Sequence, residues 1–502
     1  MSLRARLGLV CLVAIPHIAL ANPVAPPAPA DQPVKKALIL GVDGLRADLL
    51  RLGRAPAVQR LMDEGGYTEE MRTGPVTVSG PGWSNALCGV WMDKHGCKDN
   101  KFEGVDYGRY PHLFLRARQR LPEAKLCHYI GWAPIDEQIL GDGPADERRR
   151  NTGDAAGDRA SAEQAIAAIE AGRMDLGFLY FHHLDDMGHA HGFHASVPEY
   201  VAQWEVIDGH IGRVMDAIRR RDPAREDWLV LLVTDHGGTI DGGHGRDIDE
   251  HRIVPMVAWG RGVARGRWLE TVNQVDVAPT VLAHLGVAID PAWDYDGRVV
   301  GRVAARRIGD NLIVNAGAEQ GLGRDAVLPD RGIPGWTDTG SATVLRYGAT
   351  GGYATPASPG SAGRGANFFV GGKAKEARIE QVVGFAEHGA RIDQGEVQVE
   401  VSGWFGGFAD QRDLCWLELE WMDADLRVLG RAALPAASVG DRRAAFGGEK
   451  DSWTGMLQRQ ASFAPPTRTR AARCVLRFEA ASGDNDGCAD DLVLRLVARR
   501  GS

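Results

Sequence analysis

The first half of the chain carries acids and histidines at spacings that suit metal binding. Three aspartates each follow, within four residues, a short apolar run typical of a buried strand, at ALILGV, LGFLYF and WLVLLV. Histidines stand close to two of these acids, and another lies in a glycine-rich GGHG loop. The candidate ligands are Asp43, Asp185, His189, Asp235, His236 and His244. Oxygen and nitrogen ligands of this kind suit zinc, with manganese or iron as less favoured occupants.

A hydroxyl lies in the turn SGPG that begins at Ser79, just before a helix-like run over 83–90. The free N–H groups and positive dipole of a helix N-terminus favour a phosphate oxygen or a serine alkoxide. Serine is a weak nucleophile unless a base or a metal activates it, and two neighbouring metals match the chemistry of phosphoryl transfer. Ser79 is therefore the candidate nucleophile and Thr77 the alternative, although such a turn by itself is more often a plain loop.

Length and charge bound the possible functions. At 502 residues the chain is too long for one ordinary core, so we expect two or three domains. The net charge of -8 gives no basic field for a polymeric nucleic acid. A small anionic substrate would need local positive charge, which metal ions could supply.

The N-terminus has the pattern of a secretory signal over residues 1–21. Arg4 and Arg6 form a basic start, residues 7–20 are mostly apolar, and Ala19-Leu20-Ala21 offers a cleavage site. The apolar run is shorter than the roughly 20 residues that a membrane span needs. Residues 22–36, rich in Pro and Ala, look like a flexible tether. We therefore expect a periplasmic or secreted protein without a membrane span.

Export permits disulfides, and loss of Cys11 with the signal leaves six cysteines. A metal role is less favoured for them, because they lack paired Cys-x-x-Cys spacing. The expected pairs are Cys97 with Cys127, and Cys415 with Cys474 or Cys488.

Apolar runs and helical patterns alternate through the first half of the chain. The expected strands are Ala37–Val42, Ala124–Trp132, Leu176–Phe181, Trp228–Val233 and Ile253–Trp259. The expected helices are Leu45–Leu52, Ala57–Gly65, Ala162–Gly172, Pro198–Arg221 and Val275–Leu285. This alternation predicts an α/β domain over 37–306, with a mostly parallel sheet, helices on both faces and ligands at the carboxyl ends of the strands.

From Asp310 onward, short alternating runs with frequent glycine replace the long helical patterns. They predict an all-β jelly-roll sandwich over 307–502. The Gly/Ser/Pro-rich tract 349–367 is expected to be a long loop within this sandwich, because strand-like runs flank it. Trp404, Trp416 and Trp421 are expected in the sandwich core rather than on a sugar-binding surface.

The first half resembles the alkaline phosphatase superfamily and, within it, the type I phosphodiesterase/nucleotide pyrophosphatase family. The resemblance covers about residues 36–306 and rests on the order and joint presence of several motifs. They are GVDGLR at 41–46, the Ser79 turn, GVWMDKHG at 89–96, DDMGHAHG at 185–192, TDHGG at 234–238 and GGHG at 242–245. The resemblance implies an alkaline-phosphatase-like fold.

The resemblance also implies roles for single residues. It implies one zinc held by Asp43, Ser79, Asp235 and His236, and a second zinc held by Asp185, His189 and His244. Asn100 matches the family's asparagine that donates to a phosphoryl oxygen. Asp185 is preferred to Asp186 because it restores the spacing to His189. The implied reaction is attack by Ser79 on phosphorus, a covalent intermediate on the serine, and its hydrolysis.

The chain departs from the family at the nucleophile. Nucleotide pyrophosphatases carry a threonine within Thr-Phe-Pro-Asn where this chain has SGPG at Ser79, so nucleotide specificity does not follow from the resemblance. The superfamily's sulfatases use a cysteine followed by proline and arginine. This turn lacks that cysteine and arginine, which argues against sulfate esters.

The second half resembles galactose-binding-like jelly rolls. The resemblance rests on NLIVNAGAEQG at 311–321, Trp336, GRGANFFVGG at 363–372 and DNDGCADDLVLRLV at 484–497. Such domains often carry a structural calcium, for which Glu319 and either Asp490 or Asp491 are the candidates. A fold resemblance does not show sugar binding.

Together these features predict an exported two-metal hydrolase of small-molecule phosphate esters, in the first place a phosphodiesterase or nucleotide pyrophosphatase. A phosphomonoesterase with the same site is the first alternative, since the sequence does not fix what lies beside the phosphate. The alternative of another class is a glycan-binding surface protein whose front domain is a non-catalytic metal domain.

Overall fold

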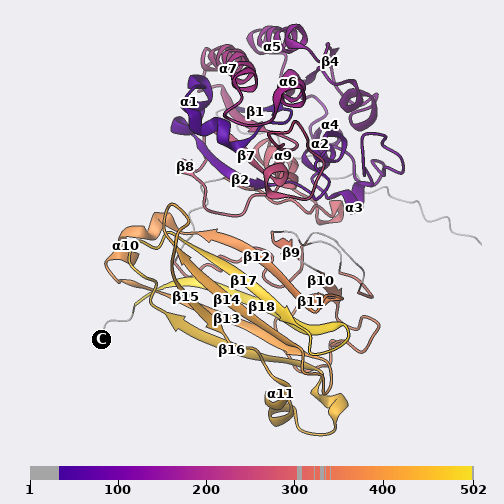
Figure 1. Ribbon diagram of the computed structural model, residues 1–502, viewed down its shortest axis with the longest axis vertical. Helices are drawn as coiled ribbons and strands as arrows, with labels where there is room; N and C mark the ends of the chain where they lie inside the picture. Colours follow the sequence, from indigo (N-terminus) through magenta and orange to yellow (C-terminus); the bar gives the residue numbers. More distant parts are fainter. Residues whose placement is uncertain are drawn as a thin grey trace, which may run out of the picture.

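The computed structural model describes residues 33–301, 308–320, 323–327, 333, 335–339 and 341–499. They form an α/β domain and a β-sandwich (Figure 1). The predicted signal peptide, most of the predicted tether and the predicted domain boundary at 306/307 lie outside the described residues. Within the described ranges, no helix combines the length and the apolar character that a membrane crossing requires.

An eight-stranded sheet forms the centre of the α/β domain, in the spatial order β4-β3-β5-β1-β6-β7-β2-β8. The strands are β1 (Val34–Val42), β2 (Gly66–Arg72), β3 (Leu126–Ile130), β4 (Glu147–Arg150), β5 (Leu176–Phe181), β6 (Glu226–Val233), β7 (Ile253–Gly260) and β8 (Gly266–Arg267). β1 pairs in parallel with β5 and β6, so the carboxyl ends of these three strands meet at one edge. β7 is antiparallel to β6 and β2. The predicted mostly parallel sheet is confirmed, with three additional strands, β2, β4 and β8.

Helices cover both faces of this sheet (Figure 1). The helical segments are η1 (Ala47–Leu52), α1 (Pro56–Glu64), α2 (Ser79–Cys88), α3 (Met92–His95), α4 (Leu113–Arg120), η2 (Ile135–Ile139), α5 (Ala155–Glu170), α6 (His183–His191), α7 (Pro198–Arg219), α8 (Asp249–Arg252), η3 (Gln274–Asp276), α9 (Val277–His284) and η4 (Pro291–Trp293). Successive side chains of a strand point to opposite faces. Phe178 of β5 therefore packs in the core layer with α2, α4 and α9, and Leu179 packs in the layer with α1, α5, α6 and α7.

Two five-stranded sheets form the second domain, in the orders β10-β11-β18-β13-β16 and β15-β14-β17-β12-β9. The strands are β9 (Thr337–Thr339), β10 (Thr343–Arg346), β11 (Asn367–Gly372), β12 (Glu376–Gly384), β13 (Val397–Gly407), β14 (Leu414–Met422), β15 (Val428–Leu434), β16 (Gly455–Phe463), β17 (Ala471–Glu479) and β18 (Asn485–Ala498). The short helices are η5 (Ala386–His388), α10 (Gly389–Asp393), α11 (Val439–Phe446) and η6 (Lys450–Trp453). The predicted sandwich is confirmed, and its resemblance to galactose-binding-like domains stays a prediction.

The Gly/Ser/Pro-rich tract joins β10 to β11, which are paired neighbours in one sheet. It is therefore a loop within the sandwich, as predicted. Trp421 is 3% exposed and lies in the sandwich core. Trp416, on the same strand, is only partly buried and lies on the outer face, so its predicted core position is wrong.

The predicted disulfides are also wrong. All six described cysteines are free and buried. Cys97 packs in one core layer of the α/β domain and Cys127 in the other, with the sheet between them. Cys474 is aligned with Leu419 of β14, four positions along the strand from Cys415. Cys488 belongs to β18, in the opposite sheet of the sandwich.

Candidate active site

Neighbouring strands bring the acids of the candidate site together. Asp43 follows β1 directly, and Asp235 and His236 follow β6, which pairs with β1 in parallel. Asp185 lies on α6, the helix after β5, the other neighbour of β1. Asp43, Asp235 and His236 have no exposed surface, and Asp185 is 5% exposed.

Three of the four residues of the first predicted ligand set, Asp43, Asp235 and His236, converge. His236 Nε2 lies 3.5 Å from Asp43 Oδ1 and 3.3 Å from Asp235 Oδ2. One ligand atom from each of these three side chains lies within 4.8 Å of the other two. This is a spacing that one ion could span.

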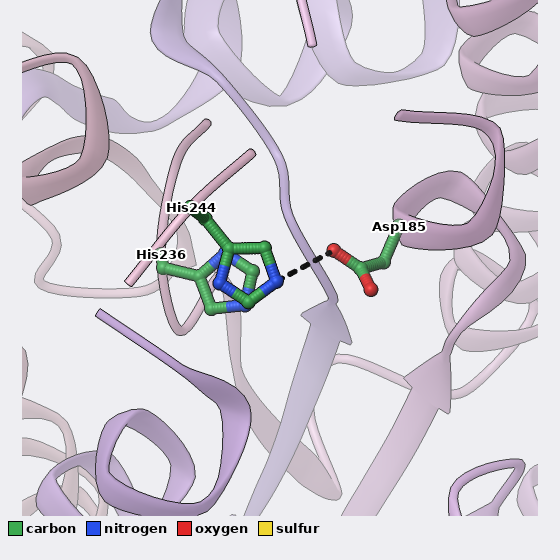
Figure 2. A group of neighbouring side chains, drawn as sticks. All are labelled: Asp185, His236 and His244. Carbon is green, nitrogen blue, oxygen red and sulfur yellow. Dashed lines mark ion pairs between the residues drawn. The ribbon is translucent and has the colours of Figure 1, made fainter. Parts of the chain in front are cut away.

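The second predicted set converges beside the first. His189 Nε2 lies 3.3 Å from Asp185 Oδ2 and 3.0 Å from His244 Nε2, and His244 Nε2 lies 4.0 Å from Asp185 Oδ1. Figure 2 shows Asp185 facing His244, whose ring overlaps that of His236; the two ring centroids are 3.9 Å apart. His236 is therefore also within reach of the second set, and Asp185, His236 and His244 form a further compact group.

Four buried polar atoms at this site have no hydrogen-bond partner among the described residues. They are Asp43 Oδ1, Asp185 Oδ1, Asp235 Oδ2 and His236 Nε2. The second oxygens of two of these acids are bonded: Asp43 Oδ2 accepts from Trp83 Nε1 at 3.2 Å and from the Tyr180 hydroxyl, and Asp235 Oδ1 accepts from Gly44 N at 3.2 Å. Buried polar atoms without partners are rare in folded proteins. All four belong to side chains of the two compact groups described above, and cations there would supply the missing partners.

Three histidines are oriented so that Nε2 is the nitrogen available to a metal. His189, His236 and His244 each donate from Nδ1 to a backbone carbonyl at 2.9 Å, those of Gly242, Gly237 and Thr77. A neutral ring that donates from Nδ1 keeps its lone pair on Nε2, the nitrogen that faces the cluster here. Burial, with the neighbouring His236, lowers the pKa of His244 to about 4, so this ring is neutral at neutral pH.

The carboxylates of the site oppose one another's ionisation. Burial and the charges of Asp43 and Asp185 raise the pKa of Asp235 well above its ordinary value. Burial also opposes ionisation of Asp43, but hydrogen bonding to His182 and the charges of His236 and His182 hold its pKa below the ordinary value. A divalent cation would allow all three acids to stay ionised, because its charge reverses the local balance.

The two candidate hydroxyls differ in their surroundings. Ser79 is the first residue of α2 and is 5% exposed. Thr77 is fully buried; its hydroxyl donates to Arg246 O at 3.0 Å and accepts from Gly245 N at 3.1 Å. These bonds tie the turn before α2 to the loop of His244. They also occupy the Thr77 hydroxyl, which argues against its use as a nucleophile.

The residue after Ser79 is glycine for a steric reason. A Cβ at Gly80 would lie 2.9 Å from both Asn100 Oδ1 and Asp99 O, and 3.1 Å from the ring of Phe102. No aromatic side chain fits there. Gly80 N donates to Asn100 Oδ1 at 2.7 Å, which leaves the amide nitrogen of Asn100 as a donor for a ligand.

Sequence reasoning missed two partners of Asp43. Trp83 has no exposed surface, its ring contacts Phe178 and Tyr180 of β5, and its indole N–H donates to Asp43. Tyr180 is the second partner. The signal available for Tyr180 was its position near the carboxyl end of β5, on the strand beside Asp43. Asp186, the rejected alternative to Asp185, has a side chain that is 49% exposed and lies 3.3 Å from His183.

The calcium candidates of the sandwich gather around Gly317. A Cβ on Gly317 would lie 3.5 Å from Asp490 Oδ1, 3.3 Å from Asp491 Oδ1 and 3.9 Å from Glu319 Cγ. Glu319 Oε1 accepts from Asn367 N at 2.8 Å, and Asp490 Oδ2 accepts from the Tyr347 hydroxyl at 2.6 Å. Over the described residues, groups of three ligand atoms within 4.8 Å occur at the α/β site and not here, so calcium stays a prediction.

Known proteins match parts of the chain. The Mus musculus ectonucleotide pyrophosphatase/phosphodiesterase family member 1 is 26% identical over 238 residues, 42% of this chain and 25% of that protein. The 2,3-bisphosphoglycerate-independent phosphoglycerate mutase of Paracoccus denitrificans is 26% identical over 211 residues, 40% of this chain and 36% of the mutase. The chain thus spans only about a quarter to a third of the length of these relatives.

Solved structures are similar at low identity. A murine ectonucleotide pyrophosphatase/phosphodiesterase 5 in complex with AMP is 16% identical with a TM-score of 0.41, covering 51% of this chain and 96% of that one. A 2-O GAG sulfatase is 12% identical with a TM-score of 0.46, covering 69% of this chain and 82% of that one.

The match to a family model covers the segments that carry the metal-site motifs. Residues 37–123 and 141–241 match the model of the type I phosphodiesterase / nucleotide pyrophosphatase family. Of the predicted ligands only His244 lies beyond the matched segments. Together with the relatives above, this match agrees with the resemblance to the alkaline phosphatase superfamily that the motifs carry.

Proposed function

We propose that the α/β domain is a two-metal hydrolase of phosphate esters that acts on phosphodiester or nucleotide pyrophosphate bonds through Ser79. The observation that carries this proposal is the group of four buried ligand atoms without hydrogen-bond partners, at the strand edge next to the N-terminus of α2. The family match supports the reaction class.

Two zinc ions fit the proposed ligands. The first would be held by Asp43, Ser79, Asp235 and His236, and the second by Asp185, His189 and His244. The donor set, mixed carboxylate oxygens and imidazole nitrogens, is one that zinc prefers. When bound, the metals would lower the pKa of the serine hydroxyl and offset negative charge on the phosphoryl oxygens.

The chain's own residues account for the remaining steps. Ser79 Oγ loses its proton to solvent and forms a bond to phosphorus, while the ester oxygen leaves with its electron pair and takes up a proton from solvent. The N–H groups of the first turn of α2 favour the anionic phosphoryl group. The Asn100 amide, oriented by Gly80 N, donates to a phosphoryl oxygen. Water then attacks the phosphorus, the bond to Ser79 Oγ breaks, and the serine regains its proton.

The relatives differ in what happens to the phosphoryl group. Mutases transfer the phosphoryl group to a second acceptor. In phosphodiesterases and pyrophosphatases, the phosphoryl or nucleotidyl group is transferred to water. A phosphomonoesterase with the same metals and serine is the alternative hydrolase. Gly80 stands where nucleotide pyrophosphatases have the phenylalanine after the nucleophile, so a preference for nucleotides does not follow from the resemblance.

The test compares hydrolysis of bis-p-nitrophenyl phosphate and p-nitrophenyl phosphate by zinc-loaded protein. Ser79→Ala is expected to abolish the activity, while Thr77→Val, the matched hydroxyl two residues away, keeps a measurable part of it. A diester preference supports the proposal, and a monoester preference moves the enzyme to the phosphatases. Activity that survives in Ser79→Ala contradicts the proposed nucleophile.

We further propose that the protein is exported. The basic start, apolar run and Ala19-Leu20-Ala21 site support cleavage after residue 21. N-terminal sequencing of protein from the periplasm or medium tests this, and a mature chain that keeps Arg4 and Arg6 would contradict it.

For the sandwich, a specific observation favours glycan binding as a second function. Trp416 lines a hollow of about 560 Å³ on the outer face of β12, β14 and β17, beside Arg378 and Arg477. An aromatic ring beside polar donors and acceptors is suited to a sugar. Retardation of the full chain in gels that contain polysaccharide, lost in Trp416→Ala, would support it, whereas equal mobility with and without each polysaccharide would oppose it.

A further inference from the structure

A buried polar network joins the end of β6 to the nucleophile helix, and Gln274 is at its centre. Gln274 is the first residue of η3 and has no exposed surface. Its side-chain nitrogen donates to Thr234 O at 3.0 Å and to Asp235 O at 2.9 Å. The two amide protons of Gln274 are therefore donated to the carbonyls of Thr234 and Asp235. One side chain thus holds the two peptide groups that precede the proposed ligands Asp235 and His236.

The oxygen of the same amide is bonded to α2. Asn85 Nδ2 donates to Gln274 Oε1 at 3.1 Å, and Asn85 lies on α2, six residues after Ser79. At the same contact, a Cβ on Gly82 would lie 2.8 Å from Asp235 O, so helix and strand end already touch. The Gln274 amide thus connects α2, which carries Ser79, to the segment after β6 that carries Asp235.

The network continues toward Asn100. His95 Nε2 donates to Asn85 Oδ1 at 2.9 Å, and His95 Nδ1 accepts from Cys97 N at 3.0 Å. This pattern requires a neutral ring, and burial lowers the pKa of His95 to about 3. The ring therefore keeps one donor and one acceptor at neutral pH, and it lies five residues before Asn100.

The backbone of Gln274 is itself fixed. Asn273 and Asp276 form a reciprocal capping box around η3, and Asp276 Oδ1 accepts from Arg298 N at 2.8 Å. A side chain on a fixed backbone can hold its partners at a set distance. A buried amide with all its bonds made could also be an ordinary core residue, but this one bonds the peptide of a ligand and the helix of the nucleophile.

We propose that Gln274 is a positioning residue of the active site. Its amide sets the separation and orientation between α2, which carries Ser79, and the peptides that present Asp235 and His236. This inference rests on the proposed function. Gln274 lies outside the segments that match the family model, which end at residue 241.

The test replaces Gln274 by methionine, which has the same length and makes none of the hydrogen bonds. Gln381→Met is the matched control, because Gln381 is 2% exposed and likewise bridges a backbone, accepting from Val314 N at 2.9 Å and donating to Val314 O at 3.0 Å. The readouts are zinc affinity, the visible spectrum of the cobalt-substituted protein, kcat and KM. Loss of a residue that orients a metal ligand costs roughly 10- to 100-fold in metal affinity or activity.

We expect Gln274→Met to weaken zinc binding and lower kcat by such a factor, with an altered cobalt spectrum, while Gln381→Met changes thermal stability alone. A folded Gln274→Met with the parent's zinc affinity, spectrum and kcat overturns the proposal. If Gln274→Met does not fold, Asn85→Ala cuts only the helix side of the link, and an unchanged kcat in that variant overturns it. If the parent binds zinc but hydrolyses no phosphate ester, the proposed function fails, and affinity and spectrum still decide on Gln274.

Discussion

Replacing Gly82 by alanine tests whether the contact between α2 and the end of β6 sets the active-site geometry. Gly82 lies on α2, three residues after Ser79. A Cβ there would lie 2.8 Å from both Cβ and O of Asp235, and 3.1 Å from its carbonyl carbon. Two of these neighbours are backbone atoms, which cannot swing away as the end of a flexible side chain can. Either helix or strand end must move.

The size of the effect follows from these distances. Ordinary contact begins near 3.4 Å, so the contact must open by about 0.6 Å, the difference from 2.8 Å. Overpacking of this kind costs about 1–3 kcal/mol, and the higher helix propensity of alanine returns about 1 kcal/mol. The net loss of stability is therefore small, about 0–2 kcal/mol. Catalysis is more sensitive, because a misplacement of 1 Å can cost about 100-fold, and we expect kcat to fall about tenfold or more.

Gly209→Ala is the control for this prediction. Gly209 also lies within a helix, α7, and a Cβ there would meet no atom within 4 Å. The same chemical change should leave kcat unchanged and raise the unfolding free energy by about 0.5–1 kcal/mol. The measurements are kcat on bis-p-nitrophenyl phosphate, zinc content and thermal unfolding. Undiminished kcat and zinc content in Gly82→Ala would refute the reasoning that this contact fixes Ser79 against Asp235.

Three further predictions concern the metals and the sandwich. Asp43→Asn is expected to reduce bound zinc by about one equivalent and kcat at least 100-fold, since it removes a charged ligand; full zinc content by metal analysis would contradict it. Zinc at 100 times its Kd is expected to stabilise chelator-treated protein by about 2.7 kcal/mol, and an unfolding temperature indifferent to zinc would argue against a metal site. Burial and the charges of Asp491 and Glu319 raise the pKa of Asp490 from 3.8 to about 7, against the opposing bond from Tyr347. The folded state therefore holds this proton more tightly, and up to about 4 kcal/mol of stability, present below pH 3.8, is lost as pH rises through 7. Calcium should restore stability at pH 8, and Asp490→Asn should reduce the pH dependence of the unfolding free energy measured by calorimetry. An equal pH dependence in that variant would contradict the raised pKa of Asp490.

The buried strands could be predicted because a parallel strand covered on both faces is a continuous apolar run. β5 is buried at every position, and its predicted bounds are the observed ones. β2, GYTEEMR, lies toward the edge of the sheet and exposes Glu70, so its composition hides it. The antiparallel direction of β7 could not be predicted from the sequence either, because strand direction changes the hydrogen-bond pattern and not the apolar pattern.

The cysteine pairs fail for a reason of the same kind. Cys127 alternates with Leu126 along β3, and the two side chains pack in different core layers. Whether Cys127 faces the layer of Cys97 depends on which helices cover which face. The topology of the whole domain decides this, and the spacing of residues within one strand carries no information about it.

The candidate ligands could be predicted from short motifs because glycines in these motifs leave room for the side chains that pack around the site. A Cβ on Gly41 would lie 2.7 Å from the ring of Trp83, and one on Gly44, at φ +66°, would lie 2.8 Å from Asp185 Oδ1. The glycines on both sides of Asp43 thus make room for the helix and the acid that complete the site, so a short motif carries tertiary information.

The residues that hold the site together have no such local signature. Asn85 and Gln274 are 189 residues apart in sequence, and no motif around either amide marks it as a positioning residue. Their bond can be recognised only when the fold brings α2 and η3 together beside the Asp235 carbonyl. Ligand identity is therefore encoded in contiguous motifs, whereas the distance between nucleophile and ligands is set by contacts that only the folded chain makes. Variants at Gly82 and Gln274 test the distance between nucleophile and ligands independently of ligand identity, because they leave every predicted ligand in place.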